Sequence, residues 1–242
     1  MTRPFVPLLF MAVMAAVVPA QAEEIAERPK IMVTGEGEAT LAPDMAVIRL
    51  SVLREADTAR EAMDANNEAM ERVIAALKEA GVAERDIQTS GLSITPQYIY
   101  PDGKNGESRP RIDGYQVTNG LTVRVRDLGK VGEILDRSVT LGVNQGGDIV
   151  FTNDDPKEAL NEARRKAVED ALAKARILTE TAGVALGDVL EITENTRGTP
   201  PPMPFGVRAM RMEAAADASV PVEAGENTYQ VEVRFTFAID QK

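Results

Sequence analysis

The sequence contains no cysteine and no histidine. Without cysteine the chain can form no disulfide bond, and it cannot carry the lipid-modified cysteine of a lipoprotein. Without histidine there is no Ser-His-Asp triad, and the two absences together exclude Cys–His pairs and metal sites built on either residue. Catalysis would have to use carboxylates, lysine, tyrosine, serine or threonine, so the composition disfavours an enzyme.

Basic residues are also fewer than acidic ones. The sequence has 27 Lys and Arg and 38 Asp and Glu, which gives a formal net charge of −11. Nucleic-acid binding needs a basic footprint, and anionic membrane surfaces repel an acidic protein. We therefore expect no nucleic-acid partner. The chain without its first 22 residues is still long enough to bury one large or two small hydrophobic cores.

No apolar run reaches the ~20 residues that a membrane-spanning helix needs. The apolar stretch Phe5–Val18 follows Arg3 and precedes the small-residue sequence AQA at residues 20–22. This order is typical of a cleaved Sec-type signal peptide. We expect residues 1–22 to be removed and residues 23–242 to reach the periplasm as a soluble protein, either free there or associated with the outer membrane.

The stretch TGEGEATLAPD, residues 34–44, looks at first like a glycine-rich phosphate loop. A dinucleotide fingerprint needs a third small residue and then a helix, but Thr40 and Pro43 follow here, and the next residues are typical of a strand. The Gly-Lys-Ser or Gly-Lys-Thr of a P-loop is absent as well. The pattern therefore predicts that Gly35 and Gly37 kink a strand that turns into a second strand.

Two helices are marked by their first residues. Thr58 and Glu61 form a capping box, and apolar residues recur at helical spacing from there until Gly81. A shorter helix is expected at Leu128–Leu141, after the capping residue Asp127.

A third, longer helix is expected to begin at Asp155-Pro156, with Asp155 as its N-cap, and to end at Gly183. Its apolar face consists mainly of alanine, at positions 163, 167, 171, 175 and 182. Such small side chains should allow a sheet or another helix to approach closely.

Alternating or β-branched runs predict the strands. They lie at residues 45–53, 87–98, 115–125, 147–151, 188–193 and 229–239. The segments AGVAERDI (80–87) and AGVALGDV (182–189) each join a helix to a strand, which reflects either an internal duplication or the common form of such junctions. We expect an α+β fold of two β-α-β type units with extra antiparallel strands, and with helices packed on mixed sheets.

Two loops interrupt this pattern, a polar one at residues 100–113 and a long one at residues 197–227. A loop as long as the second is uncommon within a domain, and it carries Met203, Phe205 and Met210. One interpretation is a surface flap or disorder. The other is contact with an envelope protein or a membrane through residues 200–212.

Five polar residues resemble parts of functional sites, but each suits a simpler role. Asp154 and Asp155 suit a helix cap better than a metal site, and Asp44 suits a turn after Pro43. Asp102 lacks the alternating oxygen ligands of a calcium loop, and Ser90 has no histidine to activate it. We therefore expect no catalytic, cofactor-binding or metal-binding residue.

Four segments in order resemble one bacterial family. They are VTGEGEATLAPDMAVIRL, DIQTSGLSITPQY, GYQVTNGLTVRVRDLGKVGEILD and ARRKAVEDALAKARILTETAG. Together they are similar to the SIMPL-domain proteins, which include periplasmic immunogenic proteins. The resemblance implies that residues 23–242 form one SIMPL-like α+β domain, which could have two parts at about 28–100 and 111–240. It also implies an envelope protein without an established catalytic site, a link to envelope or oxidative stress tolerance, and ring or channel-like assemblies in some members.

Three function classes follow, and the first is favoured: a homo-oligomeric scaffold or channel-like assembly of the envelope. The alternative is a monomeric binding module for a small molecule or a protein client, and an enzyme based on carboxylates is the third. An unprotected sheet edge would favour pairing between chains. We expect Arg124 and Arg126, on the polar face of the strand at 115–125, to restrain such pairing.

Overall fold

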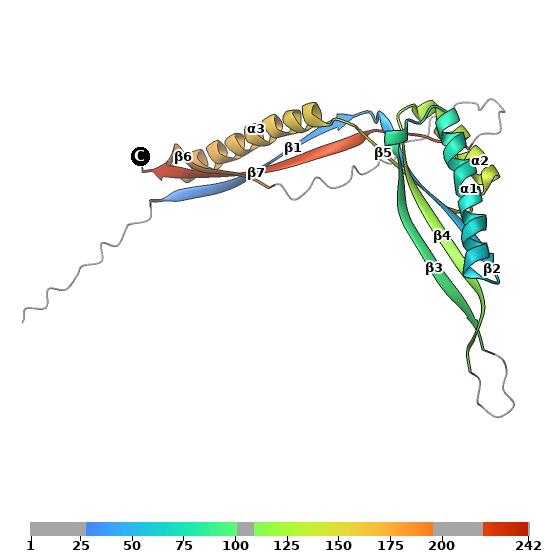
Figure 1. Cartoon of the computed structure of the whole chain (residues 1–242). Helices are drawn as coiled ribbons and strands as arrows, with labels where there is room; N and C mark the ends of the chain where they lie inside the picture. The colour runs from blue at the N-terminus through green and yellow to red at the C-terminus, as the bar shows by residue number, and fades with distance from the viewer. Residues whose placement is uncertain (1–27, 101–108, 196–219, 242) are drawn as a thin grey trace, which may run out of the picture.

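The computed structural model describes residues 28–100, 109–195 and 220–241. Figure 1 shows their elements as two elongated arms that meet at an angle. The elements are β1 (Lys30–Leu41), β2 (Met45–Ala56), α1 (Ala59–Glu79), η1 (Glu84–Asp86), β3 (Ile87–Ile99), β4 (Arg111–Val125), η2 (Leu128–Lys130), α2 (Val131–Leu141), β5 (Gln145–Thr152), α3 (Lys157–Ala182), β6 (Ala185–Glu194) and β7 (Asn227–Asp240). The predicted signal peptide, Asp102 and the segment 200–212 lie outside the described residues.

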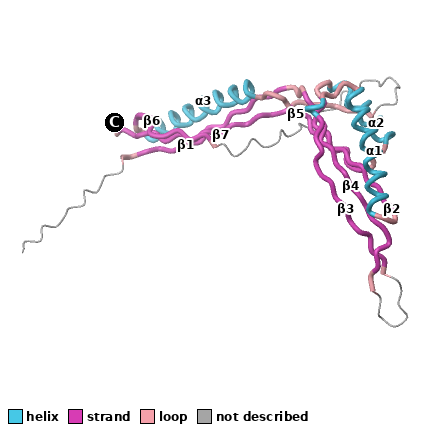
Figure 2. The backbone as a smooth tube through the Cα atoms, viewed as in Figure 1, coloured by secondary structure: helices cyan, strands magenta, loops and turns pink. Residues whose placement is uncertain are grey.

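Each arm contains one sheet, and the α+β class is confirmed. The first sheet has the strand order β1-β7-β6, and the second has the order β3-β4-β2-β5. Helix α3 lies along the first sheet, while α1 and α2 cover one side of the second (Figure 2). No helix in the described ranges is long and apolar enough to cross a membrane.

The sheets are antiparallel rather than mixed, which corrects the sequence-based expectation. Every described strand pair is antiparallel. The first expected β-α-β unit exists in split form, because β4 lies between β2 and β3. The second does not form, since the strands on either side of α3, β5 and β6, belong to different sheets.

The predicted helix boundaries are close to those observed. Thr58 and Glu61 make the complete capping box of α1, and Gly183 ends α3 with the left-handed φ of 73°. Helix α3 begins one residue later than expected, with Pro156 at the N-cap position. The Asp155 carboxylate still accepts a hydrogen bond from the N–H of Lys157 at 3.2 Å, so it satisfies a free donor of the first turn.

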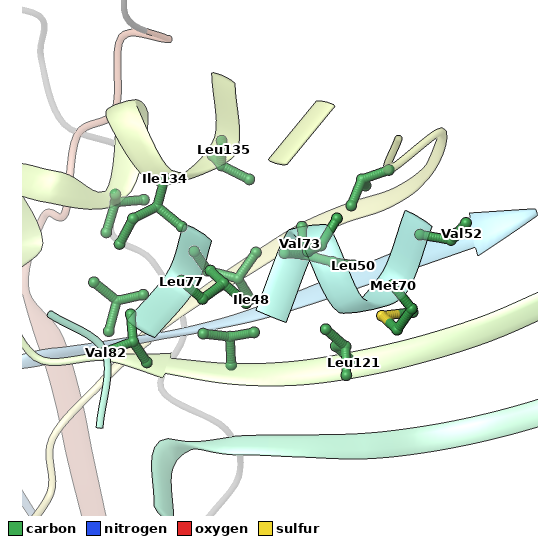
Figure 3. Close-up of a cluster of buried hydrophobic side chains, with 14 of the residues drawn as sticks. Ile48, Leu50, Val52, Met70, Val73, Leu77, Val82, Leu121, Ile134 and Leu135 are labelled. Carbon is green, nitrogen blue, oxygen red and sulfur yellow. The ribbon is translucent and has the colours of Figure 1, made fainter. Parts of the chain in front are cut away.

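The core of the second arm lies between its sheet and α1 and α2. Figure 3 shows side chains of α1, such as Val73 and Leu77, packed on those of β2 and on Leu121 of β4. One polar residue enters this core. The amide of Asn66 donates to the carbonyl oxygens of Val52 and Val117, at 2.7 and 3.1 Å, and so joins the helix to both strands.

The core of the first arm uses the alanine face of α3. Ala163, Ala167 and Ala171 are fully buried against strands that carry Phe235 and Phe237, whose rings stack with centroids 5.5 Å apart. The expectation of close approach to a sheet is confirmed. Large side chains therefore come from β7 and small ones from the helix.

The two glycines of the TGEGEATLAPD stretch lie under this helix. A Cβ atom on Gly35 would be 2.0 Å from the Ala167 carbonyl oxygen, and one on Gly37 would be 2.1 Å from that of Ala163. Strand β1 continues through both positions in unbroken register with β7, and the chain turns only after Leu41, before β2. The glycines therefore mark no break in the ladder. The glycines allow the backbones of α3 and β1 to touch.

Candidate functional site

The two sheets have four edge strands, β1, β6, β3 and β5, which differ in charge and in exposed apolar surface. An edge strand presents unpaired backbone N–H and C=O groups to any other chain that can pair with it. Of the four edges, β5 is the least suited to pairing. It is eight residues long with an irregularity at Arg49/Leu50 of its partner strand, and such short, bulged edges pair poorly.

The edge at β1 is closed by side chains of α3. Asp170 accepts a hydrogen bond from the N–H of Glu36, while Lys166 and Lys174 donate to the carbonyl oxygens of Glu38 and Thr34, at 2.9, 2.9 and 3.1 Å. These three helix residues follow one another at intervals of four and so lie on one face. Three of the backbone groups that a second strand would need are therefore already bonded.

The same helix residues hold one another in place. Lys174 lies 2.6 Å from the carboxylate of Asp170, and Lys166 lies 2.7 Å from that of Glu162. The hydrogen bonds from Lys174 and then from the Glu36 N–H lower the pKa of Asp170 below its ordinary value. At neutral pH the carboxylate is therefore ionised and remains an acceptor.

The opposite edge of this sheet, β6, is open and negatively charged. It is the last strand in the order β1-β7-β6 and has no strand partner on its outer side within the described ranges. Val189, Leu190 and Ile192 are 47, 48 and 60% exposed. The strand also carries three carboxylates and no basic residue among its ten residues. It combines an open backbone with exposed apolar side chains and negative charge.

The third edge, β3, is open and uncharged. None of its thirteen residues is charged, and Leu92, Ile94 and Tyr98 are each about half exposed. Figure 1 shows β3 and β4 continuing beyond the end of α1, so the helix leaves this part of the strand uncovered. Exposed large apolar side chains that cluster in this way often mark contact sites.

Strand β4 is not an edge, which corrects the expected role of two arginines. It lies between β3 and β2, so Arg124 and Arg126 cannot restrain pairing there. Arg126 instead donates to Asp86, which is buried, and to Asp154, at 3.1 and 2.7 Å. The Arg126 guanidinium lowers the pKa of Asp154, through its hydrogen bonds first and its charge second.

A small hollow lies beside Arg126. It holds about 180 Å³ and is lined by Arg85, Arg124 and Lys130 among other residues. Ligand pockets are commonly roughly 300–1,000 Å³, so this hollow is small for an organic ligand.

The remaining polar residues considered in the sequence occupy structural positions. Asp44, in the β1–β2 connection, accepts a hydrogen bond from the N–H of Asp154 at 2.9 Å, and Ser90 lies at an irregularity in β3.

A buried polar joint connects the two arms, and sequence reasoning missed it. The Asn153 amide donates to the Ala42 carbonyl oxygen at 2.6 Å, and its oxygen accepts from Asn227 and from the Tyr229 hydroxyl at 3.0 and 2.9 Å. Burial raises the pKa of the Tyr229 phenol. No local motif marks Asn153, because its partners come from chain segments more than 70 residues away.

The arrangement can bind, but it brings no recognised catalytic set together. Within the described ranges, no group of three or more Asp and Glu side chains is placed to hold a metal ion. The chemistry available at the open edges is main-chain hydrogen bonding combined with apolar contact. That is the chemistry of β-strand addition between polypeptides.

Comparison with known proteins agrees with this picture of a family without assigned chemistry. The model of the SIMPL family, described as a protein of unknown function (DUF541), matches residues 31–237. The 26 kDa periplasmic immunogenic protein of Brucella melitensis is 55% identical over 223 residues, which cover 91% of this chain and 89% of the relative. The uncharacterized protein YggE of Escherichia coli is 28% identical over 222 residues, covering 91% and 85%. The resemblance read from the four sequence segments is confirmed.

Proposed function

The chain belongs to the SIMPL family, and we propose that it is a non-catalytic protein of the periplasm that works as a homo-oligomeric scaffold. The printed name of the Brucella relative supports the location, and so does the signal-like order of the first 22 residues. The absence of histidine and cysteine supports a role without catalysis.

The open, neutral edge of β3 is the observation that carries this proposal. When two copies of a strand pair and the strand carries charges of one sign only, the charges of one copy repel those of the other. Strand β3 carries no charge and avoids that repulsion, while Leu92 and Ile94 supply apolar surface to bury. The same contact is unfavourable at β6, where three carboxylates would approach three others.

Two features limit where the pairing can occur. Pro96 has no N–H to donate, and the ladder between β3 and β4 is irregular between Thr89 and Gly91. The contact would therefore centre on residues 91–95, which include both exposed apolar side chains. A segment of this length needs further contacts to give a stable assembly.

The finer parts of the proposal rest on the family resemblance. Identical chains that share a recurring contact usually form closed assemblies, so a ring or channel-like particle is the form we propose. A role in envelope or oxidative stress tolerance is proposed on the same basis. Contact with an envelope protein or the outer membrane through residues 200–212 is a further part of this proposal, tested by deleting that segment and measuring association with membranes.

Light scattering coupled to size exclusion tests the assembly. Residues 23–242 should form a particle of several chains, and Ile94→Lys should reduce its mass because each copy would bring a positive charge into the apolar contact. Met32→Lys is the matched control, since Met32 is 57% exposed but lies on β1, whose edge is closed. A monomer at ~50 μM would overturn the proposal and favour the small binding module.

A further inference from the structure

Strand β6 is not explained by the proposed self-assembly. It is exposed and apolar like β3, but it carries Asp188, Glu191 and Glu194. Because like charges placed opposite each other destabilise a strand pair, a second copy of β6 is an unfavourable partner. The strand on the other side of the sheet, β1, is closed by α3, so one of the two edges of this sheet is left for another polypeptide.

The direction of the backbone groups shows how a partner could pair with β6. The N–H of Asn195 donates to the Glu232 carbonyl oxygen of β7 at 3.2 Å. Successive residues of a strand point their backbone groups to opposite sides, and the register is regular from Ile192 to Glu194. The N–H and C=O of Thr193 therefore face β7, and those of Ile192 face outward.

The side chains show what the partner must carry. The register places Val189 and Ile192 opposite Phe237 and Phe235, on the side of the sheet that α3 covers. They extend the apolar surface beside the helix, where an incoming strand would find apolar contact for alternate residues.

The charges around β6 determine which charge an incoming strand should carry. Glu194 is held by Arg164 at 3.0 Å, which leaves Asp188 and Glu191 as the exposed carboxylates of the strand. Arg234 of β7 lies across the ladder from Thr193 and offsets one negative charge. Glu232, which is also in β7, adds a negative charge. An incoming strand with basic residues is therefore favoured over a neutral or acidic one.

From these observations we propose that the outer edge of β6 is a docking site for an extended polypeptide segment in which apolar residues alternate with lysine or arginine. The segment adds as a fourth strand to the sheet β1-β7-β6. Its backbone bonds to the outward groups around Ile192, its apolar side chains contact Val189 and Ile192, and its basic side chains lie near Glu191 and Asp188. This site is separate from the β3 contact of the proposed scaffold.

Two labelled peptides of about nine residues test the proposal, a length that spans one strand. In the first, valine alternates with lysine, and in the second glutamate replaces every lysine. Fluorescence anisotropy with residues 23–242 should show saturable binding of the lysine peptide. Raising the salt from about 50 to about 500 mM should weaken it, because screening reduces the attraction of the carboxylates. The glutamate peptide should bind at least tenfold more weakly.

Substitutions at Ile192 locate the peptide. Ile192→Pro removes an outward N–H while the ladder to β7 stays intact, so it should weaken binding roughly two- to tenfold, as the loss of one hydrogen bond does. Ile192→Thr is the matched control because it keeps the N–H and the β-branch, so it should weaken binding less than the proline. Thermal melts that match the wild type show that both variants are folded.

Four results would overturn the proposal. Equal binding of the two peptides would remove the charge preference, and binding unchanged by Ile192→Pro would place the peptide elsewhere. No binding of the lysine peptide up to ~1 mM would show that the edge is not a docking site. A change of particle mass in Ile192→Pro would assign β6 to a second copy, whereas the Ile94→Lys result reports separately on the β3 contact.

Discussion

The carboxylate of Asp170, on α3, accepts a hydrogen bond of 2.9 Å from the backbone N–H of Glu36, on β1. A helix side chain thus takes the place that a carbonyl oxygen of another strand would occupy. Because Lys166 and Lys174 do the same for neighbouring carbonyl groups, this edge cannot add a strand without losing three bonds. The molecule therefore directs strand addition to its other edges.

The charge of Asp170 should make part of the stability depend on pH. Its folded-state pKa is below the ordinary value of about 4. A carboxylate with a lowered pKa contributes stability that is present above its unfolded pKa and is lost as the pH falls through the folded pKa. Urea unfolding of the wild type and Asp170→Asn should show the difference shrinking from pH 7 to pH 3. A difference that grows as the pH falls would contradict this account.

Gly35 should not tolerate a methyl group. Gly35→Ala places Cβ 2.0 Å from the Ala167 carbonyl oxygen, so α3 must move away from β1 at a cost of about 1–3 kcal/mol. Gly129→Ala is the matched control, because its Cβ would lie in ordinary contact, 3.4 Å from Asp127 Oδ1. Urea unfolding should place the control within ~0.5 kcal/mol of the wild type. Equal effects of the two changes would contradict the close helix contact.

Locally encoded features were readable from the sequence. Thr58 and Glu61 lie three residues apart, and the capping box they predicted is present. The alternation that predicted the last strand is also observed, with Phe235 buried and Arg234 exposed. Each of these patterns is confined to one element, so the residues that produce it are neighbours along the chain.

Features that depend on strand order could not be read in the same way. The sequence predicts that Gly35 kinks its strand, because the residue that it contacts, Ala167, is 132 positions away in the chain. Arg124 and Arg126 are expected from the sequence to restrain pairing between chains, because nothing in β4 itself shows that β3 covers its edge. The closure of β1 has a sequence signal in retrospect, the acidic and basic residues at intervals of four along α3, but that signal is common on solvated helices.

The last strand carries the largest side chains of its core. Phe235→Ala and Phe237→Ala should each destabilise the protein by roughly 3–5 kcal/mol, since both rings are buried and stacked. Glu232→Ala, on the face away from α3, should change the free energy of unfolding by less than ~0.5 kcal/mol. Urea unfolding gives the ranking, and a larger effect at Glu232 would reverse the assigned faces.

Export should depend on the small residues before the predicted cleavage point. Replacing Ala20 and Ala22 with leucine should leave an uncut precursor, because the signal peptidase accepts small side chains at these positions. Mass spectrometry of the periplasmic and membrane fractions measures the outcome. Normal processing of the double variant would show that the cleavage site lies elsewhere.

The joint at Asn153 should control both stability and shape. Asn153→Ala removes an amide and leaves the Ala42 carbonyl, the Asn227 amide and the Tyr229 hydroxyl without their partner. Leaving such buried groups unsatisfied costs about 1–3 kcal/mol. Tyr229→Phe is the matched, milder change, because it removes one hydroxyl and leaves the bond from Asn227 to Asn153 in place. We expect it to cost less than Asn153→Ala.

A change in the shape of the molecule would distinguish a joint between the arms from an ordinary core contact. Asn153 follows β5 of one arm, while Asn227 and Tyr229 belong to β7 of the other. Loss of the joint should therefore loosen the angle between the arms (Figure 1). Small-angle scattering of Asn153→Ala under conditions where it is folded should show a broader distribution of distances than the wild type. Gly35→Ala, which acts within one arm, should not. An unchanged distribution in Asn153→Ala would mean that other contacts fix the angle.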